Sequence, residues 1–453
     1  MNRSTLISSI ALLGIACTSG PDPDTGLDPD DCVDTDTDTD TDSDTDTDTD
    51  TDPEGRAGWW DLGMTDYVLN EVALYYLGQS WMGATDVAEV LETLSRVDES
   101  DPYGWSHAFQ DTAERLEAVA RTSEEAGHPF SAAMAYQRAS TYYRASLHRH
   151  PDPFADDVPI LAQAAVDAHE RYLALSGSPC RPVAIPYEDT TLPGYWCTPP
   201  GATSPAPTLI FHEGKDGWAE DGKFVVDAGI ARGYNVLTFD GPGIGKTIRR
   251  QGLPFRPDWE AVITPVVDFL QDQPEVDDDR IGLVAVSLGG YLAPRAAAYE
   301  PRLAVLVANP GVNDWGAANL AELGYIDPRL PDLYATDKAA FDAAIYELME
   351  VSDFIRWGVT DSMWHYGADS PSGFLDAVQE YKLGDDVKKI KARTLIMDAD
   401  AETRGQALEL FEDLETEKAY IKFSEEEAAQ FHVQPGATAI LTHRLFDWLD
   451  DNL

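Results

Sequence analysis

The stretch from residue 280 to residue 311, RIGLVAVSLGGYLAPRAAAYEPRLAVLVANPG, constrains the fold more than any other part of the chain. Two apolar runs of strand length, at 280–286 and 303–309, are joined by a helix-forming segment that begins directly after a serine. Near-continuous apolar strands separated by helices are typical of a parallel sheet that is buried on both faces. The stretch therefore predicts an α/β fold with a mostly parallel sheet.

The same alternation extends over the chain after Gly177. The first two apolar runs flank Asp189 and predict a hairpin, whereas the later runs predict buried parallel strands. We expect strands at 182–188, 192–197, 208–212, 234–240, 280–286, 303–309, 394–399 and 419–423. Residues 312–391 interrupt the alternation with helical, Trp-rich sequence, which predicts an insertion into a core formed by residues 179–453.

Residues 59–178 predict a separate helical domain. Apolar residues recur at spacings of three and four in segments 66–77, 85–97, 113–127, 131–150 and 160–175. We expect these helices, together with the insertion, to form a cap over the sheet.

Ser287 lies at the predicted turn from strand to helix. In the G-x-S-x-G nucleophile elbow a strained turn presents a serine at a helix N-terminus, and the turn needs very small residues two positions to either side. Here those residues are Ala285 and Gly289, so alanine replaces the usual first glycine. The pattern predicts that Ser287 is a nucleophile.

A nucleophilic serine needs a general base, and the base needs an orienting acid. Of the nine histidines, His432 follows the last predicted strand in a loop, whereas His443 falls within the final amphipathic helix, so we expect His432 to be the base. The loop after the preceding strand offers two acids. A spacing of four residues from Asp398 favours Glu402, and Asp400 is the alternative.

Two backbone N–H groups are expected to form an oxyanion hole. One belongs to Leu288, and the other to Gly214 or Lys215 in the loop EGKDG at 213–217. A second glycine-containing loop, DGPGIGKT at 240–247, resembles a nucleotide-binding P-loop, but Asp240 replaces its first glycine. We therefore expect no nucleotide, and no metal site is predicted.

Three longer stretches, at 231–270, 286–304 and 405–437, resemble the α/β-hydrolase family that includes 2,6-dihydroxypseudooxynicotine hydrolase, the fungal pigment protein that shortens a heptaketide, and the FrsA-like esterases. The resemblance spans roughly residues 60 to 453. It implies an α/β-hydrolase fold with an N-terminal helical cap. It also implies a reaction without a cofactor, on an ester or on a carbon-carbon bond next to a ketone.

The same resemblance places the nucleophile on Ser287, the base on His432 and the acid on Glu402, where family members usually carry aspartate. It also maps onto Asp216 an additional acidic residue that acts on the leaving group. The alternative for Asp216 is a structural role in capping the helix that follows it.

The N-terminus has the features of an exported protein. Residues 1–17 carry a basic start, a short apolar run and an ending, LGIAC, that resembles the lipobox of bacterial lipoproteins, in which Cys17 would be lipidated. Residues 18–58 are rich in alternating Thr and Asp and predict a disordered tether. We expect a protein anchored by lipid to the bacterial cell envelope, most plausibly the outer membrane, or secreted.

Cys180 and Cys197 lie at equal distances from the centre of the predicted hairpin. A register-true hairpin would place them opposite one another, so we predict a disulfide, and two half-buried thiols are the alternative.

The net charge of −49 excludes a nucleic-acid partner. Residues 1–58 hold 16 acidic and two basic residues, which leaves −35 on the folded part and predicts a preference for neutral or cationic substrates. We expect a small-molecule substrate, membrane contact through the lipid anchor alone, and an oligomeric state that may include a homodimer.

These features together predict an exported serine hydrolase for a small, aromatic or polyketide-like substrate. Two alternatives stay open: a serine peptidase-like hydrolase, and a catalytically inactive binding lipoprotein built on a hydrolase scaffold.

Overall fold

The structure is a computed structural model that describes residues 62–201, 205–402 and 405–453. The predicted signal peptide, Cys17 and the Thr-Asp segment lie outside the described residues. Among the helices of the described ranges, none has the length and apolar character needed to cross a membrane.

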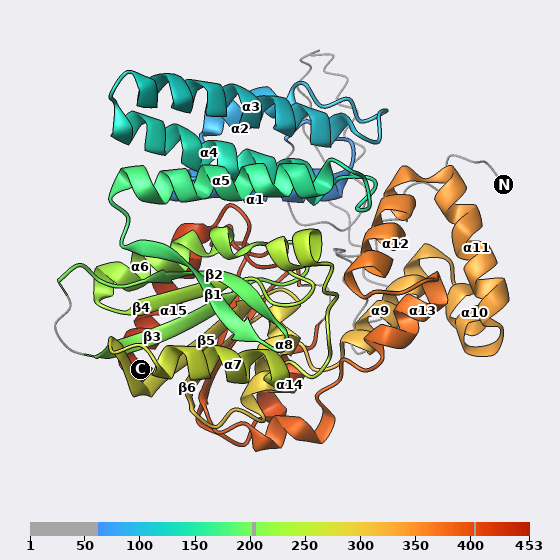
Figure 1. Cartoon of the computed structure of the whole chain (residues 1–453). Helices are drawn as coiled ribbons and strands as arrows, with labels where there is room; N and C mark the ends of the chain where they lie inside the picture. The colour runs from blue at the N-terminus through green and yellow to red at the C-terminus, as the bar shows by residue number, and fades with distance from the viewer. Residues whose placement is uncertain (1–61, 202–204, 403–404) are drawn as a thin grey trace, which may run out of the picture.

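An eight-stranded sheet forms the centre of the core (Figure 1). Its order is β1-β2-β4-β3-β5-β6-β7-β8, with β1 antiparallel to β2, β2 antiparallel to β4, and all other neighbours parallel. The predicted α/β class with a mostly parallel sheet is confirmed. The strands are β1 (Cys180–Tyr187), β2 (Thr190–Cys197), β3 (Ala206–His212), β4 (Asn235–Phe239), β5 (Val276–Val286), β6 (Leu303–Asn309), β7 (Arg393–Ala399) and β8 (Lys418–Phe423).

Helices cover both faces of this sheet. One face packs against α7 and α8 through side chains such as Val262 and Leu292, and the other packs against α6 and α15 through side chains such as Val225 and Leu445. Because both faces are buried, the central strands are apolar along their whole length. The core helices are α6 (Lys223–Arg232), α7 (Glu260–Gln271), α8 (Gly289–Ala297), α14 (Ala407–Asp413) and α15 (Thr438–Asn452), with short turns η4 (Ala219–Gly222), η5 (Thr247–Gln251) and η6 (Gly384–Lys389).

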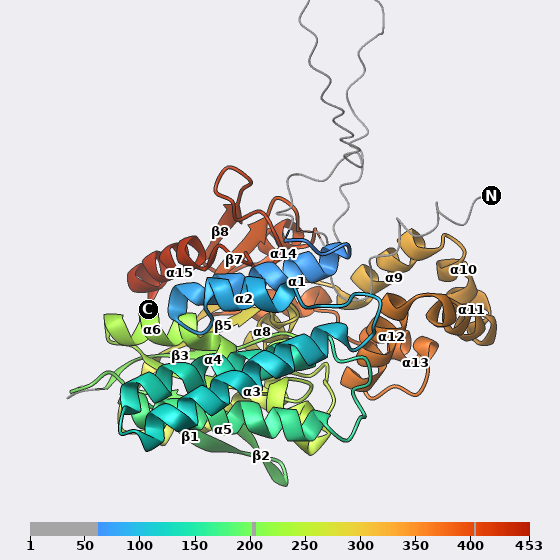
Figure 2. The ribbon, with the colours of Figure 1, turned by 90° about the horizontal axis from the view of Figure 1, so that it is seen from above.

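Two helical layers flank the core (Figures 1 and 2). The N-terminal cap has its own hydrophobic cluster and lies over one side of the sheet, while the insertion lies beside the cap, with α12 nearest to it. The cap comprises α1 (Tyr67–Gly78), η3 (Gln79–Met82), α2 (Val87–Leu94), α3 (Gly104–Glu125), α4 (Pro129–His148) and α5 (Val158–Ser176). The insertion comprises α9 (Trp315–Ile326), α10 (Leu330–Thr336), α11 (Lys338–Val351), α12 (Asp353–His365) and α13 (Pro371–Val378).

Helix α3 begins at Gly104, nine residues before the segment expected from the sequence. Its first turns bury Trp105 and Phe109, and the Trp105 indole donates a hydrogen bond to the Ala145 carbonyl at 2.9 Å. These turns are stabilised by tertiary contacts with α4 rather than by a local capping signal, which explains why the sequence pattern did not reveal them.

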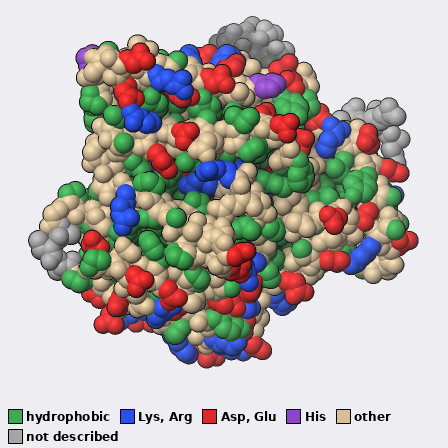
Figure 3. All heavy atoms as spheres, viewed as in Figure 1, with side chains coloured by type: hydrophobic (Ala, Val, Ile, Leu, Met, Phe, Trp, Pro, Cys, Tyr) green, Lys and Arg blue, Asp and Glu red, His purple; other side chains and the backbone are tan. Residues whose placement is uncertain are grey.

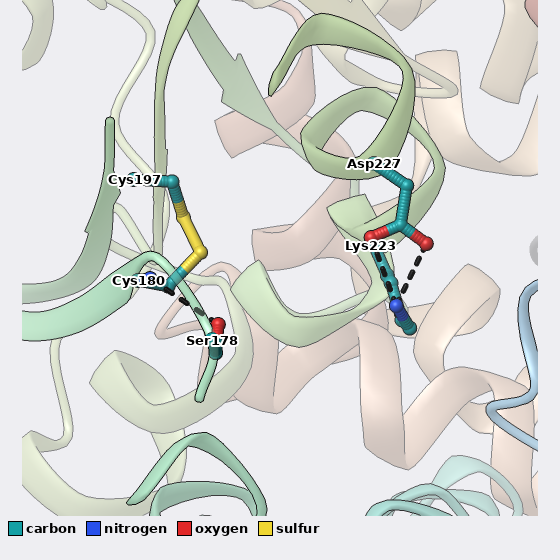
Figure 4. The surroundings of a disulfide bond; sticks show 5 residues. All are labelled: Ser178, Cys180, Cys197, Lys223 and Asp227. Atoms are coloured by element: carbon teal, nitrogen blue, oxygen red, sulfur yellow. Dashed lines mark hydrogen bonds and ion pairs between the residues drawn. A yellow bond between two sulfur atoms is a disulfide. The ribbon is translucent and has the colours of Figure 1, made fainter. Parts of the chain in front are cut away.

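One covalent link closes the hairpin, and one ion pair holds the cap to the core. Cys180 and Cys197 pair in register across β1 and β2 and are joined by a disulfide (Figure 4). Arg144 of α4 forms an ion pair of 2.9 Å with Asp221 of η4, and their side chains are 1% and 4% exposed. A buried pair of this kind makes separation of the cap from the core costly.

Candidate active site

The turn between β5 and α8 has the geometry of a nucleophile elbow. Ser287 has a φ of 58°, in the left-handed region that non-glycine residues rarely adopt. A Cβ atom on Gly289 would lie 2.8 Å from the Cβ of Ala285, and one on Gly290 would lie 1.7 Å from the Pro310 carbonyl oxygen. Alanine is therefore tolerated at 285 because position 289 has no side chain.

Three side chains form one hydrogen-bonded chain at this turn. The Nε2 atom of His432 lies 3.0 Å from Ser287 Oγ, and its Nδ1 atom lies 2.6 Å from Glu402 Oε2. The side chains of His432 and Glu402 are 9% and 2% exposed. Because an ionised carboxylate only accepts, Nδ1 carries the proton and Nε2 is left to accept the hydroxyl proton of Ser287.

Asp400 lies outside this chain. Its carboxylate is 3.1 Å from Lys422 Nζ and accepts a hydrogen bond from the Glu425 N–H, and its side chain is 43% exposed. Asp398 accepts a hydrogen bond from the Tyr420 hydroxyl, and burial raises the pKa of its carboxyl group. Of the acids in this loop, Glu402 is the one placed against the imidazole.

The loop after β3 approaches the elbow closely. A Cβ atom on Gly214 would lie 2.7 Å from both the Leu288 nitrogen and the Ser287 Cβ, so only glycine lets the backbone come this near. Leu288 immediately precedes α8, where backbone N–H groups lack helical partners and favour negative charge. His212 anchors the loop, since its Nδ1 lies 2.9 Å from the Glu213 carbonyl oxygen.

Lys215 turns its side chain toward the insertion. Its Nζ lies 2.5 Å from Asp361 Oδ2, with both side chains buried, and 5.7 Å from the Trp357 ring centroid. Asp361 Oδ1 also lies 3.5 Å from His365 Nε2. Burial alone would raise the pKa of Asp361, but Lys215 and His365 hold it below its usual value. Helix α12 thus supplies the counter-charge for the catalytic-side loop.

Asp216 lies beside this group, and its carboxylate, Asp361 and His365 offer ligand atoms within 4.8 Å of one another. The ammonium of Lys215 lies 3.8 Å from Asp216 and 2.5 Å from Asp361, so a protein cation already pairs with two of these three groups. The start of η4 is capped by Asp221 rather than by Asp216, since the Asp221 carboxylate accepts from the Trp218 N–H at 3.0 Å.

Comparison with known proteins identifies the fold family. Residues 192–446 match the alpha/beta hydrolase family. The chain belongs to the alpha/beta hydrolase family. It is 32% identical over 400 residues to the hydrolyase poxO of Penicillium oxalicum, covering 82% of this chain and 94% of the relative. It is also 32% identical over 406 residues to the 20-hydroxy-prefusarin hydrolase FUS2 of Gibberella moniliformis, covering 83% and 94% of the two chains.

The fold of this hydrolase is similar to a solved structure as well. The crystal structure of the 2,6-dihydroxy-pseudo-oxynicotine hydrolase superposes with a TM-score of 0.64 at 19% identity and covers 83% of this chain and 95% of that chain. The family resemblance inferred from the sequence is thereby confirmed.

The lysine of the P-loop-like segment is paired with two acidic residues of the hydrolase. The ammonium of Lys246 lies 2.8 Å from Glu220 Oε1 and 3.4 Å from Asp240 Oδ2, with all three side chains buried. The lysine that would bind phosphate in a nucleotide site is therefore already neutralised.

Two cavities border the hydrolase core. The larger, of about 440 Å³, lies between α4, α5 and α6 beside the disulfide, and Ser287, His432 and Glu402 do not line it. The smaller, of about 40 Å³, is lined by Tyr75, Glu213 and the chain neighbours of Ser287 and His432, among others. The smaller cavity is thus the one that adjoins the hydrogen-bonded chain.

Sequence reasoning missed the side chains that α12 and η5 bring to this region. Asp361, His365 and Trp357 belong to the Trp-rich stretch FIRWGVTDSMWHYG, which signalled a buried helix but not its partners. Arg249 follows the P-loop-like segment, and two adjacent arginines after a buried loop were the available signal.

Proposed function

We propose that this alpha/beta hydrolase is a serine hydrolase whose catalytic triad is Ser287, His432 and Glu402. The observation that carries the proposal is that His432 is hydrogen-bonded to both other residues at once, in the tautomer that a general base requires. The positive φ of Ser287 supports it independently, because such strain is characteristic of a nucleophile elbow.

The geometry supports a two-step reaction. His432 takes the proton from Ser287 as the hydroxyl oxygen attacks a carbonyl carbon, and the N–H group of Leu288, together with that of Gly214 or Lys215, stabilises the resulting oxyanion. The imidazolium then protonates the leaving group. Water, activated by His432, hydrolyses the acyl-enzyme and regenerates Ser287.

The proposed substrate is a small organic molecule with an ester or with a carbon-carbon bond next to a ketone. By name, one relative acts on 20-hydroxy-prefusarin, and the structural neighbour acts on 2,6-dihydroxy-pseudo-oxynicotine. In carbon-carbon cleavage Asp216, in the loop beside Ser287, would assist protonation of the departing carbon.

A fluorophosphonate probe tests the triad. We expect the wild type to be labelled, the Ser287→Ala variant to be unlabelled, and the labelled peptide to contain residue 287. An unlabelled wild type would instead support the inactive binding-protein alternative. A panel of aryl esters and acyl-phenol ketones then separates ester hydrolysis from carbon-carbon hydrolysis.

We also propose export with a lipid anchor on Cys17. The disulfide between Cys180 and Cys197 supports an oxidising compartment. In the native host we expect the wild type in the membrane fraction and the Cys17→Ser variant outside it, and equal partitioning of the two would exclude the anchor.

A further inference from the structure

Arg249 is a buried cation that forms no ion pair within the part of the chain that the structure describes. It lies in η5, a π-helical turn, and is 9% exposed. Its guanidinium stands 4.8 Å from the Trp218 ring centroid and 5.4 Å from that of Trp364. Its Nη1 donates to the Gly245 carbonyl at 3.3 Å, but among the described residues no carboxylate forms an ion pair with it. π-Helical turns are rare and often occur at functional sites.

Arg149 is a second arginine of similar character, immediately after α4. Its side chain is 10% exposed and its guanidinium lies 4.0 Å from the Trp357 ring centroid. It forms one long ion pair, 3.4 Å, with Asp66. Its buried Nη1 atom has no hydrogen-bond partner in the part of the chain that the structure describes.

Both arginines interact electrostatically with Asp216, in the loop that contacts Ser287. Burial lowers the pKa of each guanidinium, and the carboxylates of Asp361 and Asp216 act in the opposite direction on both. Asp216 lies two residues after Gly214, which packs on the elbow. Trp357 contacts both Arg149 and Lys215, so the cap, the insertion and the loop after β3 meet at one cationic, aromatic wall.

A buried guanidinium without a carboxylate is costly, because the charge loses its hydration and gains no ion pair. Stacking on tryptophan offsets part of this cost. The N–H groups of a guanidinium form a planar fork that matches a carboxylate, whose charge is shared by two oxygen atoms, and one arm of the fork can donate to the single oxygen of an enolate. An arginine that stacks on aromatic rings, and that forms no ion pair with a carboxylate among the described residues, is therefore suited to an anionic oxygen of a ligand.

We propose that Arg249, assisted by Arg149, forms a subsite for an oxygen anion on the part of the substrate that departs, either a carboxylate that it carries or the enolate that forms. The inference rests on the proposed function in so far as the subsite serves the Ser287 centre. In carbon-carbon cleavage the bond from the acyl carbon to the α-carbon breaks, its electron pair moves onto the enolate oxygen at Arg249, and the His432 proton then passes to the α-carbon.

Ligand binding tests the subsite without catalysis. In the Ser287→Ala background we titrate benzoate and the neutral isostere benzamide by calorimetry, and we compare Arg249→Gln with Arg250→Gln, a matched control at the neighbouring exposed arginine. We expect Arg249→Gln to lower the affinity for benzoate at least 10-fold and to change the affinity for benzamide less than 2-fold. Arg250→Gln should change neither affinity.

Equal weakening of both ligands would assign Arg249 a purely structural role between Trp218 and Trp364 and would overturn the proposal. So would a wild-type affinity for benzamide that equals the affinity for benzoate. If Arg249→Gln fails to fold, Arg249→Lys keeps the charge but loses the fork, and we then expect a smaller but still benzoate-selective loss.

Kinetics of the active enzyme separate this inference from the proposed function. We compare an aryl acetate with its ring-carboxylated analogue, and expect Arg249→Gln to lower kcat/KM at least 10-fold for the carboxylated ester alone. Benzoate binding that depends on Arg249 in a protein that a fluorophosphonate does not label would sustain the subsite and refute the triad. Labelling of Ser287 in a protein that does not discriminate between the carboxylated and the neutral ligand would support the triad and refute the subsite.

Discussion

Glu402 lies in the loop after β7, with its side chain 2% exposed. Its carboxylate lies 2.6 Å from His432 Nδ1 and fixes the imidazole tautomer. We expect Glu402→Gln to lower kcat by roughly 10³- to 10⁴-fold, because the amide would favour the wrong tautomer, as loss of the triad acid does elsewhere. Initial rates on p-nitrophenyl acetate measure this.

Asp400→Asn is the matched control for this substitution. Asp400 contacts Lys422 and the Glu425 N–H instead of the imidazole. Because substitutions at exposed sites usually have small effects, we expect the kcat of Asp400→Asn to stay within about 2-fold of the wild type. Loss of activity in Asp400→Asn with retention in Glu402→Gln would reverse the assignment.

His212 couples acid stability to the loop after β3. Burial lowers its pKa to about 4, so its neutral form contributes stability that is present above the unfolded pKa of about 6.5 and is lost as the pH falls toward 4. We expect this single group to remove up to about 3 kcal/mol of unfolding free energy across that window. Urea unfolding at pH 7, 5.5 and 4.5 measures the loss.

In His212→Gln the unfolding free energy should depend less steeply on pH over the same window, by the uptake of about one proton. His443→Gln serves as the control, because His443 is 67% exposed in its side chain and its removal should leave the profile unchanged. Parallel profiles for the wild type and His212→Gln would contradict the assignment.

At the scale of elements, α12 supports the loop beside the nucleophile through the buried pair of Lys215 and Asp361. Asp361→Asn removes the nearer carboxylate from a buried ammonium and leaves only the longer contact with Asp216, and removal of one partner of a buried pair costs up to about 3 to 5 kcal/mol. We expect lower stability and a reduced kcat, with KM for a small ester changed much less, because the loop carries a proposed oxyanion donor. Denaturation and steady-state kinetics measure both effects.

Replacing both partners separates charge from packing. The double variant Lys215→Met/Asp361→Leu should recover most of the lost stability, since apolar pairs often replace buried ion pairs without cost. Asp376→Asn is the control, because its pair with Lys338 is 50% exposed on each side and contributes little. A double variant as unstable as Asp361→Asn would exclude the charge explanation.

The hairpin of β1 and β2 is closed by its disulfide, which spans a sequence separation of 17. By the chain-entropy relation a loop of this length contributes about 3 kcal/mol, because the cross-link restricts the unfolded chain. We expect Cys180→Ser/Cys197→Ser to lower the unfolding free energy by up to that amount and to leave fluorophosphonate labelling intact. Free thiols in the native protein, detected by alkylation before reduction, would contradict the bond.

Element types could be predicted from the sequence to the extent that they depend on local patterns. Each strand contains a run of apolar or β-branched residues that could be recognised locally, and Ser287, Glu402 and His432 follow a fixed chain order, so the strands and these three residues were predictable. The start of α3 was not, because Trp105 is held by a contact with Ala145. Nor were the partners of Lys215 and Arg249, since Asp361 and Trp364 belong to a different segment more than 100 residues away, and no local pattern encodes such contacts.

At the scale of the whole molecule, the acidic surface and the proposed subsite act on an anionic substrate in opposite directions. Acidic side chains are spread over the face shown in Figure 3, in keeping with the net charge of −49. This field reaches about 30 Å at 10 mM salt and about 10 Å at 100 mM, so it slows the approach of an anion mainly at low salt. A buried guanidinium acts at short range and is screened much less.

The salt dependence of the rate should therefore distinguish the repulsion of an approaching anionic substrate from its binding at Arg249. We expect kcat/KM for a carboxylated aryl ester to rise several-fold from 10 to 200 mM NaCl while kcat stays constant, because screening removes repulsion before binding and leaves the contact with Arg249 intact. The neutral ester, measured in parallel, should change little. A rate for the carboxylated ester that falls with salt would mean that surface cations attract the substrate, and a similar rise for the neutral ester would mean that salt alters the enzyme itself.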